Sequence, residues 1–366
     1  MPAILALFAM QPDVKTSSID VVSCGNTMGG LLKFASSTER TFRFGVEVIG
    51  NTVFFVRKEN SPRELIPGVH GYGHTFPESY TIWDAGVQGS ASHQRLVKYQ
   101  FGGLAFLVRF KSDGYLKNKI EPEDQERQAS VTPVSKPDLD IPSLLQGTDL
   151  LTVTQKVHAE QGDVKVELKG QKIPQSAVFD LKTRSAKNEI DMKEVFSRLW
   201  ATQTPNFIIG YHKSGYFDDV RVQDVSGKVG EWEAQNGELL GRLQSTIQRI
   251  IDVAKSSAGQ RLEVCRIGSG KLQIRKHVDG EWSALPPHLK DAWTKPPGDQ
   301  QHPTAASSSS SNDAVALASV AQQSDRLSPE PDARDLTLGN NGYANSDDDW
   351  LAHHDDQDDY HNEEES

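Results

Sequence analysis

Alternating apolar and polar positions predict a series of β-hairpins along the first 290 residues. The segment 42–59 has two β-branched and aromatic runs on either side of Gly50-Asn51, a dipeptide typical of tight hairpin turns. The segment 96–115 predicts a second strand pair that turns at Gly102-Gly103. Further strand pairs are predicted in LTVTQKVHA with VKVELKG, in NFIIGYHKSGYFDDVRVQDV and in LEVCRIGSGKLQIRKH.

A period of three to four residues predicts two amphipathic helices. One covers 189–203 and has apolar residues at 190, 192, 195, 196, 199 and 200; the other is longer, with apolar residues at 239, 240, 243, 247, 250 and 251. The run AILALFAM near the start is interpreted as the first turns of a helix and not as a signal peptide, because it has no basic flank. The glycine-rich stretch CGNTMGG lacks the Lys-Ser/Thr of a phosphate-binding loop and is interpreted as a turn before a helix.

Sheets and helices that alternate in this way predict an α/β (α+β) fold, with mixed β-sheets flanked by helices. Residues 1–290 are expected to form a single domain, in which the polar, proline-containing segment 117–147 is a loop insertion. The segment 295–366 is rich in serine and acidic residues and is predicted to be disordered.

The charge differs between the body and the tail. Residues 301–366 hold 15 Asp or Glu against 2 Arg and no Lys, so this segment has a charge of −13, which leaves +2 for residues 1–300 of the total of −11. A near-neutral body neither predicts nor excludes a polyanionic ligand. Two cysteines are too few for a disulfide framework or a zinc site, which favours the nucleus or the cytoplasm. No apolar run has the length of a membrane span, so no membrane association is expected.

The candidate chemistry begins with Asp180 and Lys182, which interrupt the apolar strand AVFDLKT and point to the same face of it. Burying charge is costly unless the charge is paired or binds a metal. One interpretation is therefore an edge strand with a solvated face and an ion pair. The other is half of a metal site, completed by Asp113 at the end of a strand and by Glu78 in an aromatic, glycine-containing stretch. Carboxylates suit Mg²⁺, and a lysine beside the metal can orient the attacking water.

Four motifs, in the same order along the chain, resemble those of the DXO-type decapping exoribonucleases, a family within the PD-(D/E)xK nuclease superfamily. GHTFPE, which ends at Glu78, is similar to the family motif G-aromatic-x-x-aromatic-E, and KSD, which ends at Asp113, is similar to E-h-D. DLKT, which begins at Asp180, is similar to E-h-K-T, and LWATQTPNFIIGYHK is similar to the following helix and strand. The resemblance covers roughly residues 21–275 and implies a PD-(D/E)xK nuclease-like core.

The resemblance implies a Mg²⁺- or Mn²⁺-dependent phosphohydrolase or nuclease that removes a cap, a pyrophosphate or an NAD cap from RNA 5′ ends. Glu78, Asp113 and Asp180 would hold the metal, and Lys182 and Gln203 would be the catalytic residues that place the water. An RNA 5′ end and a partner exoribonuclease are the implied partners.

Departures from the family pattern lead to an alternative function. Lys111 stands where the family has the first acid of E-h-D, and Cys24 stands where it has the arginine of an Arg-Gly motif. The alternative is a catalytically impaired protein that binds RNA or a partner on the same fold. His74 and His93 lie near the candidate site and are interpreted as structural residues and not as ligands.

The acidic stretch 355–359 formally matches the DDxxD pattern of prenyl diphosphate synthases. That pattern requires an all-helical bundle and a second aspartate-rich helix, and the strand-rich body provides neither.

Overall fold

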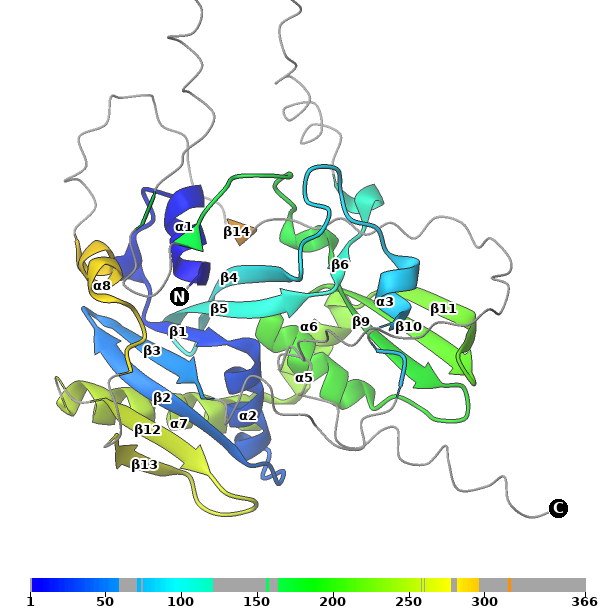
Figure 1. Cartoon of the computed structure of the whole chain (residues 1–366). Helices are drawn as coiled ribbons and strands as arrows, with labels where there is room; N and C mark the ends of the chain where they lie inside the picture. The colour runs from blue at the N-terminus through cyan, green and yellow to red at the C-terminus, as the bar shows by residue number, and fades with distance from the viewer. Residues whose placement is uncertain are drawn as a thin grey trace, which may run out of the picture.

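The computed structural model describes residues 2–58, 71–73, 75–120, 156–157, 164–257, 259, 261–277, 282–295 and 315–316, and it contains two main sheets flanked by helices (Figure 1). The helices are α1 (Pro2–Met10), α2 (Gly25–Ala35), α3 (Thr75–Tyr80), α5 (Met192–Thr202), α6 (Ser226–Gln235), α7 (Gly237–Ser256) and α8 (Pro287–Thr294), with short 3₁₀ turns η1 (Thr16–Ser18), η2 (Lys117–Lys119) and η3 (Gln175–Ala177). The predicted α/β (α+β) class is confirmed.

The larger sheet, sheet A, has eight strands in mixed orientation. Their spatial order is β13 (Gln273–Lys276), β12 (Leu262–Arg266), β2 (Phe42–Ile49), β3 (Thr52–Arg57), β1 (Val21–Cys24), β5 (Leu104–Ser112), β4 (His93–Phe101) and β14 (Val315–Ala316). Sheet B has the order β11 (Tyr216–Asp224), β10 (Asn206–Lys213), β9 (Val178–Ser185) and β6 (Gly114–Tyr115). A third, two-residue pairing joins β7 (Lys156–Val157) to β8 (Val164–Lys165).

The predicted hairpins form where the turn dipeptides place them. Strands β2 and β3 pair around Gly50-Asn51, and β4 and β5 pair around Gly102-Gly103, whose φ angles of +59° and +80° are readily adopted only by glycine. The pairs β10–β11 and β12–β13 are also confirmed. Of the predicted LTVTQKVHA–VKVELKG hairpin, only the β7–β8 pairing and the residues from 164 onward lie inside the described residues.

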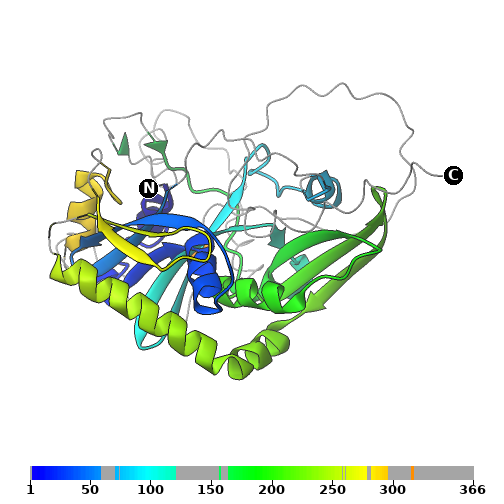
Figure 2. The same ribbon diagram turned by 90° about the horizontal axis from the view of Figure 1, so that it is seen from below.

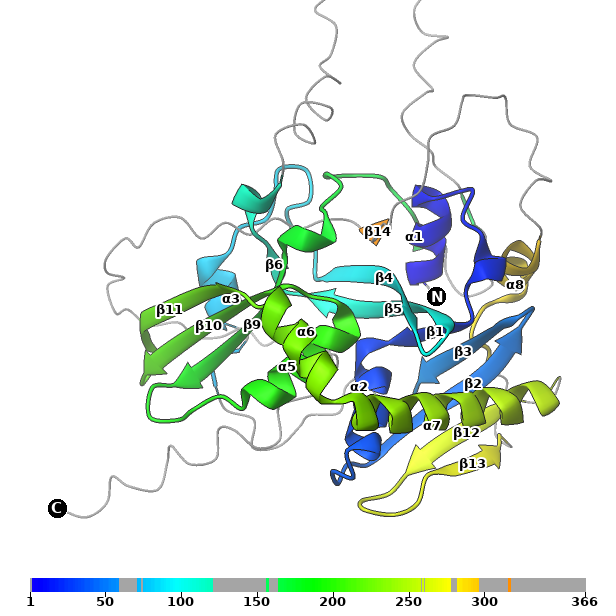
Figure 3. The ribbon, with the colours of Figure 1, turned by 180° about the vertical axis from the view of Figure 1, so that it is seen from behind.

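Helices cover both faces of sheet A. On one face, α2 and the long α7 pack against the strands (Figures 2 and 3). The buried residues Met28, Leu31, Leu243 and Ile247 of these helices belong to one apolar core. On the other face, α1 and α8 bury a second cluster that includes Leu7, Phe54, Leu107, Leu289 and Trp293. The predicted amphipathic helices correspond to α5 and α7.

The glycine-rich stretch CGNTMGG differs from its prediction. It was expected to be a turn before a helix, but α2 begins at Gly25 and contains Gly29 and Gly30, both buried. A Cβ atom added at Gly30 would lie 3.1 Å from the Phe42 ring. Gly30 therefore lets the helix approach the sheet closely, and the turn prediction was wrong because this close packing is a tertiary property.

Sheet B separates two environments around β9. The parallel register places Asp180 beside Phe207 and Lys182 beside Ile209, and both apolar partners pack in the cluster formed with α5. Asp180 and Lys182 therefore share the face that α5 covers. The edge-strand interpretation is right in two respects, because β6 pairs only with Val178 and Phe179 of β9 and the ion pair that it included is present at Asp180. It is wrong about the solvated face, because α5 covers the side of β9 that carries Asp180.

The predicted division of the chain into a domain (1–290), a loop insertion (117–147) and a tail (295–366) stays a prediction. The loop insertion 117–147 is described only through residue 120, where η2 forms, and 121–155 lie outside the described residues. Within the segment 295–366, the described part beyond residue 295 is Val315–Ala316, which pairs with Leu96 and Arg95 of β4. The disorder prediction otherwise falls outside the described residues. None of the helices that the structure describes combines the length and the apolar character needed to cross a membrane.

Candidate functional site

The chain passes from sheet A to sheet B at the end of β5. Strand β5 ends at Ser112, and two residues later β6 pairs with β9 in the other sheet. Gly114, with a φ of +155°, allows this change of direction. A pocket of about 70 Å³ opens at this junction, and it is lined by Gly25, Asn26, Arg109, Phe110, Lys111, Asp113, Asp180, Leu181, Arg198 and Thr202.

The pocket has more basic than acidic side chains. Arg109 and Lys111 alternate along β5 on the face that carries Leu107, where Arg109 Nη1 donates to Gln94 Oε1 at 3.1 Å. Arg198 comes from α5. Asp113 and Asp180 are the two lining acids. Three cations against two carboxylates give the lining a formal charge of +1.

Both carboxylates of the pocket already accept hydrogen bonds from the protein. Asp180 Oδ1 accepts from Arg198 Nη2 at 2.5 Å, and the two side chains are only 15% and 18% exposed. Asp113 Oδ2 accepts from the Leu181 backbone N–H at 2.7 Å, which joins the end of β5 to β9. Both carboxylates are therefore engaged within the protein, and hydrogen bonds to a charged group are among the stronger ones.

Two lining side chains have buried donors without an acceptor in the described part of the chain. They are Asn26 Nδ2, in the first turn of α2, and Arg198 Nε. The N-cap residue of α2, Cys24, makes no side-chain hydrogen bond to the helix end. A helix N-terminus has unpaired N–H groups and a partial positive charge. The pocket therefore has unsatisfied hydrogen-bond donors, which a ligand with acceptor atoms could satisfy.

Glu78 lies apart from the other predicted ligands. It is exposed on α3, and the neighbouring Phe76 packs against the site of Gly210, where an added Cβ would lie 2.9 Å from the ring. Gly210 faces the opposite side of sheet B from Ile209, so α3 covers the face that does not carry Asp180. Across the described ranges, no group of three His, Cys, Asp or Glu side chains is placed to hold a metal ion.

The two predicted catalytic residues lie beside the pocket and do not line it. Lys182 is half-buried and follows Asp180 on the same face of β9. Gln203 is exposed and ends α5 in a left-handed conformation, with a φ of +53°. Its Nε2 donates to the Trp200 carbonyl at 2.6 Å, so its side chain caps the helix.

The departures from the family motifs have different structural consequences. Lys111 lines the pocket, whereas Cys24 is buried and its Sγ lies 3.3 Å from Thr27 Oγ1. His93 is buried in β4, where desolvation and then the charge of Arg95 lower its pKa to about 3. His93 is therefore neutral at physiological pH, and its interpretation as a structural residue stays a prediction. His74 lies outside the described residues.

A buried arginine fixes the end of α5 next to the pocket. Arg95 is fully buried, and its Nε donates to Gln175 Oε1 at 3.1 Å while Nη2 donates to the Ile173 carbonyl at 3.0 Å. Desolvation lowers the pKa of Arg95 to about 10, which leaves it protonated at neutral pH. Gln175 Nε2 donates in turn to the Gln203 carbonyl at 2.9 Å. This chain connects sheet A to the helix that carries Arg198.

The side chains that line the pocket do not fit a divalent cation in the positions that they occupy. Mg²⁺ and Mn²⁺ require oxygen ligands from several groups. Here the two carboxylates are engaged, three cations line the same space, and the third predicted acid, Glu78, is on the opposite face of the sheet. The Mg²⁺ or Mn²⁺ site therefore stays a prediction, and the chemistry of the lining favours an anion.

Reasoning from the sequence missed Arg109, Arg198 and Asn26. Arg109 precedes Lys111 by two residues, so strand alternation could have placed both on one face. For Arg198 the local pattern contains no comparable signal, because its contact with Asp180 depends on how α5 packs on β9. Asn26 could not be placed at a helix N-terminus, because its segment was interpreted as a turn.

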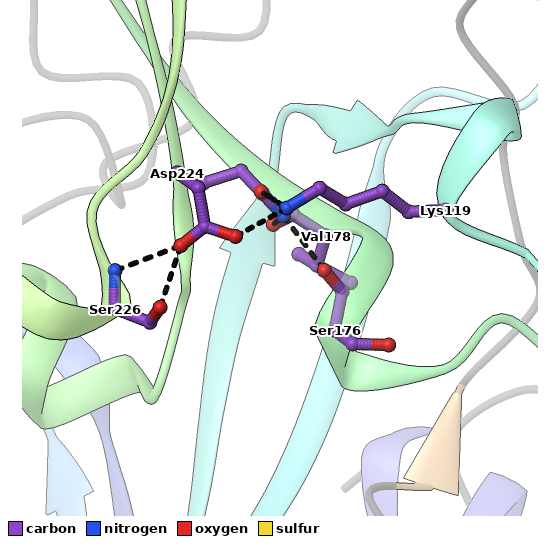
Figure 4. Close-up of polar contacts among 6 residues, drawn as sticks. Lys119, Ser176, Val178, Asp224 and Ser226 are labelled. Atoms are coloured by element: carbon purple, nitrogen blue, oxygen red, sulfur yellow. Dashed lines mark hydrogen bonds and ion pairs between the residues drawn. The ribbon is translucent and has the colours of Figure 1, made fainter.

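A second polar cluster lies at the start of β9 and β10, and we call Lys119, Asn206 and Asp224 the Lys119 clamp (Figure 4). Lys119 Nζ donates to Asn206 Oδ1 at 2.7 Å and to Asp224 Oδ2. Asn206 is fully buried and donates to the Ser176 and Val178 carbonyls, both at 2.8 Å. The clamp joins η2, β9, β10 and β11.

Comparison with solved structures finds the same fold. Rai1 from Scheffersomyces stipitis matches with a TM-score of 0.50 and 11% identity, over 80% of this chain and 77% of that chain. Candida albicans Rai1 in complex with pU5 and Mn²⁺ has a TM-score of 0.47 and 9% identity over 76% of this chain and 75% of that one. K. lactis Dxo1 in complex with manganese has a TM-score of 0.44 and 7% identity over 78% and 72%. At 11% identity, the match to Scheffersomyces stipitis Rai1 shows a similarity of fold and not of activity.

Comparison of sequences identifies a family. No curated protein matches the chain. Residues 1–265 match the model of a family described as a domain of unknown function, DUF8563. Because this match spans most of the chain, the chain belongs to the DUF8563 family, in which it has a divergent Rai1-like fold.

Proposed function

We propose that this chain binds RNA 5′ ends and does not hydrolyse them through a metal centre. Two similarities support RNA 5′ ends as the ligand: the four motifs that resemble those of DXO-type decapping exoribonucleases, and the fold shared with Rai1. The proposal corresponds to the alternative function, a binding protein on the fold of an RNA-processing enzyme.

One observation carries the proposal. The acids at the junction, Asp113 and Asp180, are bonded to Leu181 N–H and to Arg198, and Lys111 occupies the position of a family acid. Removing Arg198 from Asp180 in order to seat a metal would leave a largely buried guanidinium without its partner, which is costly. The pocket therefore favours ligand binding over metal-dependent hydrolysis.

The hydrolase remains the second candidate function, because Asp180 and Lys182 share one face of β9 as the family motif requires. It would use Glu78, Asp113 and Asp180 for Mg²⁺ or Mn²⁺, and Lys182 with Gln203 for the attacking water.

The test incubates the full chain with short RNAs that carry a cap, an NAD cap, a triphosphate or a monophosphate at the 5′ end, with Mn²⁺ present. Binding is measured by fluorescence anisotropy and product by gel analysis. We expect binding without product. Product formation that Lys182→Ala abolishes would instead support the hydrolase, and Lys111→Glu tests whether restoring the family acid creates turnover that the natural chain does not have.

A partner exoribonuclease also remains a prediction of the resemblance. Co-purification of the full chain with a 5′→3′ exoribonuclease would test it independently of the pocket.

A further inference from the structure

We infer that the junction pocket is a metal-free site for a terminal phosphate group, held directly by Arg109, Lys111 and Arg198 at the N-terminus of α2. The inference rests on the proposed function, because it assigns the chemical group by which an RNA 5′ end is recognised. It differs from the metal site that the sequence resemblance implies.

The charge of the lining favours an anion. The two arginines and Lys111 exceed Asp113 and Asp180 by one formal charge. The first turn of α2, which includes Asn26, adds the partial positive charge of a helix N-terminus. A phosphomonoester carries between −1.5 and −2 charges at pH 7, so it would compensate this excess.

The unsatisfied groups of the pocket also favour an anion. Arg198 Nε and Asn26 Nδ2 are both donors, and each is buried with no acceptor among the residues that the structure describes. Leaving a buried donor without an acceptor is energetically unfavourable. A metal ion could not relieve this cost, because it needs acceptors itself. Phosphate oxygens could relieve it, and the five N–H donors of a guanidinium allow Arg198 to keep Asp180 and bind a ligand at once.

The size of the pocket admits a small oxyanion. Its volume is about 70 Å³, which is more than a single water molecule requires. A terminal phosphate group therefore has room in the pocket.

The experiment measures equilibrium binding of the full chain to a short oligouridylate with a 3′ fluorophore, in EDTA. The ligands are the 5′-phosphorylated and 5′-hydroxyl forms, with uridine monophosphate and inorganic phosphate as competitors. We expect the 5′ phosphate to bind about tenfold more tightly than the 5′ hydroxyl, as several charge-assisted bonds would produce. Arg109→Gln and Lys111→Gln should each remove most of this preference.

Control variants separate lost binding from lost folding. Lys213→Gln removes an exposed lysine of β10 that does not line the pocket, and it should keep the full preference. Lys111→Arg keeps the charge and should restore the preference that Lys111→Gln loses. Thermal melting confirms that each variant is folded.

The outcomes distinguish the two proposals. If the affinity for RNA is the same with and without the 5′ phosphate and does not change in the pocket variants, the phosphate site is overturned and RNA binding stands. A third outcome is that the protein binds uridine monophosphate but no RNA, and that Lys111→Gln abolishes this binding. That result would support the phosphate site and contradict the proposed RNA function. A preference that requires added Mn²⁺ and disappears in Asp180→Ala would restore the metal site and overturn the inference.

Discussion

The junction pocket and the Lys119 clamp are built from the same kinds of residues, but they differ in how far their polar groups satisfy one another. In the clamp, Asn206 donates to two carbonyls and accepts from Lys119, while Asp224 accepts from Lys119 and from Ser226. In the pocket, buried donors of Asn26 and Arg198 have no acceptor within the described residues. Buried polar groups are normally paired, so a satisfied cluster stabilises the fold, whereas an unsatisfied one lining a pocket indicates a ligand.

Removing the centre of the clamp should have the largest effect. Asn206→Ala would remove the donor to the Ser176 and Val178 carbonyls and one of the two acceptors of Lys119, at a residue that is fully buried. We expect the free energy of unfolding to fall by about 3 kcal/mol, measured by urea denaturation. Gln235→Ala, an exposed change in α6, should alter it by less than about 0.5 kcal/mol. A loss below about 1 kcal/mol for Asn206→Ala would mean that the clamp is not a structural centre.

The two regions should also respond to different pH ranges. The second pKa of a phosphomonoester is about 6, so lowering the pH from 7 to 5 should weaken binding of 5′-phosphorylated RNA about threefold, a part of its roughly tenfold preference, because the ligand loses one of its two charges. The bond from Lys119, followed by those from Ser226, lowers the pKa of Asp224 to about 2 from 3.8. The contribution of Asp224 to stability is therefore complete above about pH 4 and is lost between pH 4 and 2.

Anisotropy titrations from pH 7 to 5 test the first part, with 5′-hydroxyl RNA as the ligand that should not respond. Equal pH dependence of both RNAs would exclude the phosphate as the titrating group.

Neutralising the acid of the pocket separates an anion site from a metal site. Asp180→Asn raises the formal charge of the lining from +1 to +2, because Arg198 loses its carboxylate partner. We expect the affinity for 5′-phosphorylated RNA in EDTA to rise about threefold to tenfold, while the unliganded protein melts at a lower temperature. At a metal site the same change would lower affinity. Asp218→Asn, in an exposed ion pair on β11, is the matched control.

The smallest effect is expected at the outer part of the clamp. Asp224 is about half exposed, with 52% of its side chain accessible, so its ion pair with Lys119 is screened by water. Lys119→Gln should lower the free energy of unfolding by about 0.5–1 kcal/mol at neutral pH. The difference in melting temperature from the natural chain should stay constant from pH 7 to 5 and shrink below pH 4. If Lys119→Gln lowered the free energy of unfolding by more than Asn206→Ala does, Lys119 and not Asn206 would be the more important residue for the stability of the clamp.

Much of the fold follows from local patterns in the sequence. The turn dipeptides Gly50-Asn51 and Gly102-Gly103 occur where the backbone must turn, and the apolar periods predict α5 and α7. Alternation along a strand also predicts that Asp180 and Lys182 share a face. These features could be predicted because each depends on residues close together in the chain.

The site depended on contacts between distant segments. The sequence motifs suggested Glu78, Asp113 and Asp180 as one group, but α3 packs on the face of sheet B opposite to Asp180. Motif order along the chain does not specify which face of a sheet an element covers. Likewise, no local pattern reveals that CGNTMGG forms a helix because Gly30 allows close packing on β2.

The sequence by itself determined the α+β class, the hairpins, the amphipathic helices and the shared face of Asp180 and Lys182, because periodicity and turn chemistry act over a few residues. Only the tertiary structure decided that Arg198 neutralises Asp180, that Arg109 and Lys111 reach the same pocket, and that buried donors there have no described acceptor. The physical reason is that charge balance and hydrogen-bond satisfaction depend on all the groups around a pocket, and the residues that line this one are up to 177 positions apart in the sequence, from Gly25 to Thr202.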